Sequence, residues 1–217
     1  MATTQSAIGR SITRGEGPDK VTGKSIYTAD ISVPGMLWGR VLRSPYPYAR
    51  IVSIDTSKAL ALPGVYAVVT GQDVPETRVG RRMLDMPILA QDVVRFVGEK
   101  VAAVAAGSKD ICDEALLLIE VEYEELDAVF DAEEAMESSA PDLHPDMDSY
   151  TGLPQPPSGI KNTFAHITWE KGDIEQGFKE SDIIFEHSFN AQLMHQAYIE
   201  PHACIVDASE GNQVNIW

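Results

Sequence analysis

The sequence predicts an α+β fold, and three observations lead to this class. Helical and extended patterns follow one another without a steady alternation of strand and helix, which argues against a doubly wound parallel sheet. Apolar residues make up 44% and charged residues 23% of the chain, so its composition is that of a globular protein with a core. A length of 217 residues leaves room for one large domain or two small ones.

The first part of the chain is predicted to be rich in strands. Extended, apolar-rich patterns indicate strands over 36–43, 51–55 and 65–69. Residues 56–62 favour a short helix, and Pro63-Gly64 ends it. Thus the sequence predicts a strand, strand, helix, strand order before residue 70.

The next part combines two strands around a turn with a helix and a further strand. Two strands are predicted at 93–97 and 101–106 around a Gly-Glu-Lys turn. Ser108 is a good N-cap for the helix that follows it. From Ile119 to Glu124 the apolar period changes to two, which predicts a strand with one buried and one exposed face.

The exposed face of that last strand is acidic. Glu120, Glu122 and Glu124 alternate with Val121 and Tyr123. One interpretation is a metal site or the acid/base pair of a hydrolase, and the other is a solvated sheet face. We favour the solvated face, because acids on one wet surface lack the difference in desolvation that separates an acid from a base.

The second part of the chain is less regular. Residues 137–161 hold five prolines and predict a linker or a long surface crossing. Beyond it we expect strands at 164–169 and 182–190, with a turn and short helix over 172–180 between them. Val214 to Trp217 starts a strand that we expect to lack a partner, so that another polypeptide segment completes its sheet.

Charge and cysteine content exclude several classes of function. The formal net charge of −16 disfavours nucleic acid and anionic membranes as partners. The two cysteines, Cys112 and Cys204, are too few and too far apart for an iron–sulfur cluster or a structural zinc site. Without a signal-peptide pattern or a long apolar run, we expect a cytoplasmic protein.

No complete catalytic motif is present. The sequence contains no phosphate-binding glycine loop and no nucleophile elbow. His187, His195 and His202 could meet at a metal, but their strand parity disfavours it, and a hydrogen-bonded core position is expected for His187. The densest polar cluster, His195 to His202, is interpreted either as a wall near an active site or as a structural corner made rigid by Pro201.

A series of short motifs gives the sequence a family resemblance. In chain order these motifs are KVTGK at 20–24, YTAD at 27–30, PGML at 34–37, LRSP at 42–45, ARI at 49–51, IDTS at 54–57, LPGV at 62–65, VGEKVA at 97–102 and VEYE at 121–124. Together they resemble the a/b hammerhead domain of the molybdenum-binding large subunit of the family of xanthine dehydrogenase, aldehyde oxidase, carbon monoxide dehydrogenase and 4-hydroxybenzoyl-CoA reductase. Tyr48 departs from that pattern, since the family often has histidine there.

A second block resembles the start of the molybdopterin-binding domain of the same family. It comprises Gly172-Asp173, Phe178, Ser181-Asp182 and the pattern His195, Glu200, Pro201. The resemblance implies an arm at 1–17, the a/b hammerhead domain at 18–136, a linker at 137–161 and an incomplete molybdopterin-binding domain at 162–217. It leaves His195, Gln196 and Glu200 as candidates to support the cofactor from a distance, with no catalytic residue and no metal ligand in this chain.

The resemblance also implies the chemistry and the partners. Such subunits carry a molybdenum–molybdopterin cofactor and oxidise a small-molecule substrate, with electrons passing through iron–sulfur clusters to FAD on partner domains or subunits. We therefore expect a hetero-oligomer in which the remainder of the molybdenum subunit, an iron–sulfur subunit and an FAD subunit join this chain. Two alternatives stay open, namely a non-catalytic assembly module for the redox subunits and a reductive activity of the 4-hydroxybenzoyl-CoA reductase type.

Overall fold

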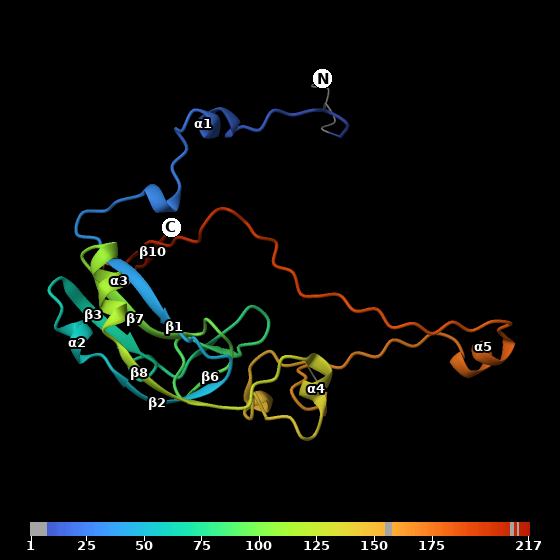
Figure 1. Cartoon of the computed structure of the whole chain (residues 1–217). Helices are drawn as coiled ribbons and strands as arrows, with labels where there is room; N and C mark the ends of the chain where they lie inside the picture. The colour runs from blue at the N-terminus through green and yellow to red at the C-terminus, as the bar shows by residue number, and fades with distance from the viewer. Residues whose placement is uncertain (1–7, 155–157, 209–210, 212) are drawn as a thin grey trace. The chain divides into compact units, whose positions relative to one another are not determined.

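The computed structural model describes residues 8–154, 158–208, 211 and 213–217 (Figure 1). The chain divides into two compact units. The inner unit comprises residues 36–182, and the terminal unit comprises residues 1–35 together with 183–217. We describe each unit by itself.

The centre of the inner unit is a three-stranded antiparallel sheet. Strand β7 (Lys100–Ala106) lies between β1 (Trp38–Arg43) and β3 (Val65–Thr70). Its alanines and valines alternate between two covered faces, so that β7 is the most buried strand. These three strands confirm three of the predicted strands, and the alanines of β7 allow a helix to approach closely.

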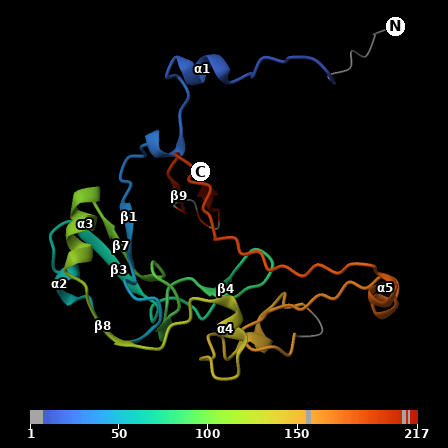
Figure 2. The ribbon, with the colours of Figure 1, turned by 45° about the vertical axis from the view of Figure 1, so that its right-hand side comes forward.

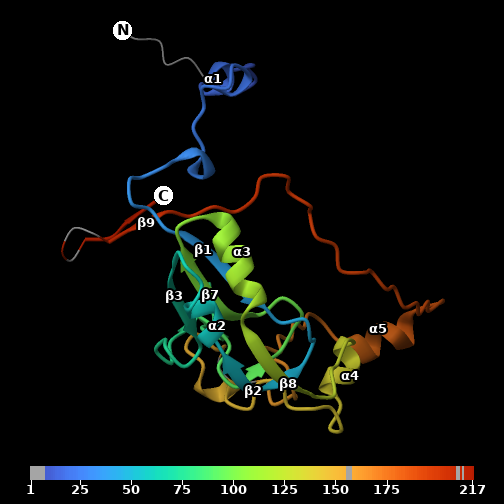
Figure 3. The same ribbon diagram turned by 60° about the vertical axis from the view of Figure 1, so that its left-hand side comes forward.

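Helix α3 (Lys109–Leu117) packs across β1 and β7 (Figure 3). The Ser108 hydroxyl accepts a hydrogen bond from the Ile111 amide at 3.2 Å, which confirms the predicted N-cap. On the inner face of the helix, Cys112 is buried and its thiol donates to the Trp38 carbonyl at 3.1 Å. Lys109 lies 4.4 Å from the centre of the Trp38 ring, so polar contacts also hold the helix against β1.

A second sheet holds β2 (Ala49–Asp55) between β6 (Val93–Val94) and β8 (Glu120–Glu125). Val121 and Tyr123 of β8 face the core, whereas the three alternating glutamates are exposed. The predicted alternation of buried and exposed side chains along this strand is therefore confirmed. Arg50 pairs with Glu124, and Lys58 pairs with Glu120, so two of the three acids have cationic neighbours on the exposed face.

The remaining elements are short. They are α1 (Gly17–Val21), η1 (Thr28–Asp30), α2 (Ser57–Leu60), β4 (Arg78–Val79), β5 (Met86–Pro87), α4 (Ala132–Met136), η2 (Met147–Ser149), α5 (Ile174–Glu180), β9 (Val206–Asp207) and β10 (Asn215–Ile216). Strands β4 and β5 form one antiparallel pair, and β9 and β10 form another. Helices α2 and α5 lie where short helices are predicted. Of the predicted arm at 1–17, residues 1–7 lie outside the described residues, and residues 8–16 form neither helix nor strand.

Two predicted strands are wrong. Residues 164–169 and 182–190 have no strand, and the chain after α5 runs without helix or strand until β9 (Figure 2). Their apolar side chains are exposed, including Trp169, Phe185 and Phe189. An alternating pattern forms a strand only when a neighbouring strand pairs with it and another layer covers its apolar face, and the described residues supply neither.

The last predicted strand forms, but it has a partner within the chain. Strand β10 pairs with β9, and Ile205 and Trp217 exchange two backbone hydrogen bonds of 3.0 Å. This corrects the expectation of an unpaired strand: the turn at Gly211 folds the chain back on itself. Among the described residues, no helix is long and apolar enough to cross a membrane.

Candidate functional site

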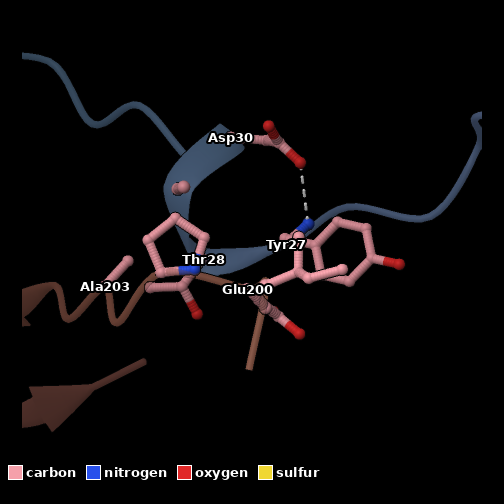
Figure 4. A pocket seen from close by; sticks show the side chains of 8 residues that line it. Tyr27, Thr28, Asp30, Glu200 and Ala203 are labelled. Atoms are coloured by element: carbon pink, nitrogen blue, oxygen red, sulfur yellow. Dashed lines mark hydrogen bonds between the residues drawn. The ribbon is translucent and has the colours of Figure 1, made fainter. Parts of the chain in front are cut away.

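A hollow of about 520 Å³ lies in the terminal unit (Figure 4). It is formed by two segments that are distant in the sequence, the η1 turn and the corner around Glu200. The lining residues are Tyr27, Thr28, Ala29, Asp30, Ile199, Glu200, Pro201 and Ala203. The hollow therefore contains one of the three predicted site residues, Glu200.

Local hydrogen bonds shape the η1 side of the hollow. The Asp30 carboxylate accepts a hydrogen bond from the Tyr27 amide at 3.0 Å, as Figure 4 shows. The Asp30 amide in turn donates to the Tyr27 carbonyl at 2.9 Å. This reciprocal arrangement closes the Tyr-Thr-Ala-Asp sequence into a single turn of 3-10 helix. The Asp30 carboxylate therefore stabilises the turn that forms this side of the hollow.

The polar lining is acidic. Asp30 and Glu200 supply carboxylates, Tyr27 and Thr28 supply hydroxyls, and no lysine or arginine is among the described lining residues. Such a lining favours groups that carry N–H donors or positive charge, and it repels a phosphate. A pterin cofactor with its phosphate therefore does not fit this hollow by itself, and we derive no chemical step from it.

The other predicted site residues, His195 and Gln196, precede the corner at Glu200 by a few residues. His195, Tyr198 and His202 form a row of rings, with centroids 5.1 Å apart in the first pair and 5.0 Å apart in the second. The Ala197 amide donates to Nδ1 of His195 at 3.0 Å, so the proton of the neutral imidazole lies on Nε2. Gln196 is exposed and is not among the lining residues that the structure describes.

The possible metal site of the three late histidines does not form here. Within the described part of the chain, no group of three histidine, cysteine or acidic side chains is placed to hold a metal ion. His187 is exposed, and its ring lies 6.4 Å from that of Phe189. The expectation of a buried core histidine is therefore wrong, because the strand that would have buried it does not form.

Sequence reasoning missed two aromatic residues of this region. The ring of Tyr198 is tilted against that of His195 and stacked on that of His202. Tyr27 lines a hollow whose other wall comes from the opposite end of the sequence. The position of Tyr198, three residues after His195 and four before His202, was the available signal. No local pattern pairs Tyr27 with Glu200, since only the folded chain brings them together.

Two family models match the chain. The a/b hammerhead domain of aldehyde oxidase and xanthine dehydrogenase matches residues 22–127, and the molybdopterin cofactor-binding domain matches residues 156–217. Both domains occur in this order, as the sequence motifs predicted. The chain belongs to the family of aldehyde oxidase and xanthine dehydrogenase.

Relatives and solved structures agree with this assignment. A probable xanthine dehydrogenase polypeptide of Bacillus subtilis is 42% identical over 188 residues, which cover 86% of this chain and 23% of that protein. The nicotinate dehydrogenase large molybdopterin subunit of Eubacterium barkeri is 37% identical over 204 residues, 94% of this chain and 45% of that protein. The carbon monoxide dehydrogenase structure from Oligotropha carboxidovorans matches with a TM-score of 0.67 and 37% identity, over 81% of this chain and 22% of its own. The chain thus spans between about a quarter and a half of the length of these relatives.

Proposed function

We propose that this chain is the N-terminal part of the molybdopterin-binding subunit of a molybdenum hydroxylase, and that it is inactive alone. In this role the inner unit supplies scaffold and interfaces, and residues 162–217 supply one wall of the molybdopterin domain. His195, Gln196 and Glu200 would support the cofactor from a distance, while the groups that hold it lie on the remainder of the subunit. The domain limits 18–136 and 162–217, separated by 137–161, belong to the same proposal.

One observation carries the proposal. In the segment that matches the molybdopterin cofactor-binding model, large apolar side chains stand in solvent: Phe189 is 94% exposed, Leu193 102% and Ile199 99%. The consecutive residues Ile183, Ile184 and Phe185 of the same segment are exposed as well. Soluble proteins rarely expose apolar side chains in contiguous groups. Because the relatives are much longer than this chain, the remainder of the same subunit is the natural cover for this surface.

The family supports a proposal for the cofactor and the partners. A molybdenum–molybdopterin cofactor would supply two-electron redox chemistry when it is bound, and electrons would leave through iron–sulfur clusters to FAD on partner subunits. We propose a cytoplasmic hetero-oligomer that acts on a small molecule. Relatives named for xanthine, nicotinate and carbon monoxide show that substrates differ widely within the family, so we assign none.

The first alternative is a non-catalytic assembly module that binds the redox subunits through the same fold. The exposed acidic face of β2 and β8 in the inner unit offers a surface for that role. Reductive dehydroxylation of the 4-hydroxybenzoyl-CoA reductase type is a second alternative. Oxidation and reductive dehydroxylation give different products, so product analysis of the assembled enzyme separates them.

Co-purification tests the proposal. The chain is produced alone and together with the remainder of the molybdenum subunit and the redox subunits, and each preparation is analysed for its polypeptides, molybdenum and pterin. We expect no molybdenum in the chain alone and one molybdenum per copy in the complex. If the isolated chain held stoichiometric molybdenum or oxidised a small molecule unaided, the proposal would be wrong. A complex without molybdenum that still binds the redox subunits would identify the assembly module.

A matched pair of variants tests the surface itself. Leu193→Glu places a charge among the exposed side chains of the molybdopterin segment, whereas Leu117→Glu places one on an exposed leucine of α3. Neither leucine is buried in this chain, so both variants should fold as the parent does. We expect Leu193→Glu to abolish co-purification and Leu117→Glu to leave it intact. Equal effects of the two changes would contradict the assignment of this surface.

A further inference from the structure

The region between the two family matches is folded onto the inner unit. The hammerhead match ends at residue 127 and the molybdopterin match begins at 156. Between them, the Leu84 amide donates to the Thr151 carbonyl at 2.8 Å. Tyr150 is 5% exposed, and the Arg78 guanidinium of β4 lies 4.6 Å from the centre of its ring. Residues 141–153 therefore pack against β4 and the turn before β5.

The backbone of Leu143 is held from two sides. Its carbonyl accepts a hydrogen bond from Nε of Arg95 at 2.8 Å, and its amide donates to Oδ1 of Asn162 at 3.0 Å. Arg95 follows β6 and lies in the hammerhead match, whereas Asn162 lies in the molybdopterin match. A single residue of the intervening region therefore links the two matched domains.

The hammerhead side of this link is anchored by a buried acid. Glu99 is 6% exposed, and its carboxylate accepts a hydrogen bond from the Arg95 amide. The Glu99 carbonyl accepts from the Ser44 amide, and the Ser44 carbonyl accepts from the Gly98 amide, both at 2.8 Å. The backbone of Arg95 is thus fixed to the turn before β7, and its side chain reaches Leu143 from there.

Asn162 has the backbone conformation and the side chain that the other side of the link requires. Its φ of +54° lies in the left-handed region, which asparagine adopts more readily than most residues. Its side-chain amide donates to the carbonyls of Ala135 and Pro141, at 2.8 and 2.9 Å. Ala135 lies in the last turn of α4, where carbonyls have no partner within the helix. With Leu143, Asn162 therefore pairs three backbone groups of the intervening region.

Two further side chains hold the same loop. Nζ of Lys161 donates to two more carbonyls of the region after α4. The Ser158 hydroxyl donates to the Thr163 carbonyl, which closes residues 158–163 into a compact loop. The loop ends at Thr163, and the next residue, Phe164, is 55% exposed. The exposed part of the molybdopterin segment thus starts from a loop that is bound to the inner unit.

We propose that Arg95 and Asn162 are positioning residues, which clamp Leu143 from both sides and fix the point at which the molybdopterin segment leaves the inner unit. A fixed starting point leaves the following residues with less conformational freedom to lose when the remainder of the subunit covers them. The clamp itself stands on the hydrogen bonds described above. Its role in assembling the molybdenum subunit rests on the proposed function.

Hydrogen exchange of the full chain tests the clamp. Asn162→Gly allows the left-handed backbone and removes all three side-chain hydrogen bonds. We expect the Leu143 amide, followed by NMR, to exchange about tenfold faster or more, while the amides of β7 keep their rates. Asn190→Gly is the matched control, because it makes the same change at an exposed asparagine, and it should alter neither rate.

A double-mutant cycle tests whether the two residues act together. Arg95→Met removes the hydrogen bond to the Leu143 carbonyl but keeps an unbranched side chain. Because both residues hold Leu143, adding Arg95→Met to Asn162→Gly should accelerate its exchange by less than the product of the two single effects. The clamp is overturned if the two effects multiply, or if the Leu143 amide keeps its rate in Asn162→Gly.

An insertion separates position from stability. Two glycines added after Thr163 leave the hydrogen bonds of the clamp in place, yet they move the start of the exposed chain by up to about 7 Å. Exchange of the Leu143 amide in the isolated chain should therefore stay as in the parent. In the complete molybdenum subunit with its partners, we expect both the insertion and Asn162→Gly to lower the molybdenum content per copy. A purely structural role of Asn162 would leave the insertion variant fully loaded.

Failure of the positioning role and failure of the proposed function give different results. If the parent complex contains molybdenum and both variants are loaded equally well, the positioning role is overturned and the proposed function stands. If the parent complex contains no molybdenum, the proposed function is overturned and the positioning role with it. In that case, exchange of the Leu143 amide still decides whether the clamp exists.

Discussion

The hammerhead part of the inner unit and the molybdopterin segment behave differently although their sequence patterns look alike. Residues 119–124 and 182–190 both alternate apolar and polar side chains, yet only the first segment forms a strand. Strand β8 has β2 beside it and a core beneath it, whereas the later segment has neither in the described structure. An alternating pattern thus specifies which face would be buried, and the burial itself needs a second layer.

Truncating a buried apolar side chain should give the largest change in the free energy of unfolding. Val101 is fully buried in β7, so Val101→Ala removes two buried methyl groups and leaves a cavity. We expect the free energy of unfolding to fall by about 2 kcal/mol in urea titration. Val52→Ala on the exposed side of β2 is the control and should change it by less than about 0.5 kcal/mol. Equal effects at the two sites would contradict the packing described for the first sheet.

A pair of glycines separates backbone strain from steric conflict. Gly152 has φ +85°, and a Cβ there would lie 2.1 Å from the Arg82 carbonyl oxygen, whereas Gly98 has φ +93° and open space around it. Gly98→Ala should cost about 1 kcal/mol through strain alone. Gly152→Ala should cost more and should also release residues 141–153 from their contact with Arg82 and Leu84, which hydrogen exchange of 141–154 would detect. Similar exchange in the two variants would show that the packing of residues 141–153 does not depend on this close approach.

Loss of a helix cap should have a smaller effect. Ser108→Ala removes the acceptor of the Ile111 amide and should destabilise the inner unit by about 1 kcal/mol, measured by denaturant unfolding. Ser108→Asp keeps an acceptor at the same position and should restore most of the loss. Failure of aspartate to restore it would mean that the cap contributes through another contact.

The smallest change in stability is expected at Leu193, and it tests most directly whether the molybdopterin segment is covered in the complete subunit. Leu193→Ala removes a side chain that stands wholly in solvent, so its cost should stay below about 0.5 kcal/mol. In the complete molybdenum subunit, where we propose that this surface is covered, the same change should cost about 2–3 kcal/mol. Thermal unfolding of both proteins measures the difference. An unchanged stability of the complete subunit would place Leu193 outside its core.

Local signals predicted the hammerhead elements well. Ser108 begins α3, Pro63-Gly64 ends the helical stretch before β3, and the alternation from Ile119 defines the faces of β8. Each of these depends on neighbours within a few residues. The site was harder to predict, since Glu200 was found through its motif and Tyr27 was not recognised as part of the same hollow.

The sequence by itself determined the family, the order of the two domains and the elements whose caps, turns and periods lie within a single segment. Only the tertiary structure decided that Tyr27 meets the corner at Glu200, that the proline-rich segment holds Tyr150 between His144 and Arg78, and that the late alternating segments stay unpaired. The physical reason is distance along the chain. A cap or a turn is stabilised by its own neighbours, whereas a pocket wall, a buried side-chain contact or a sheet partner comes from residues that meet only when the loop between them closes.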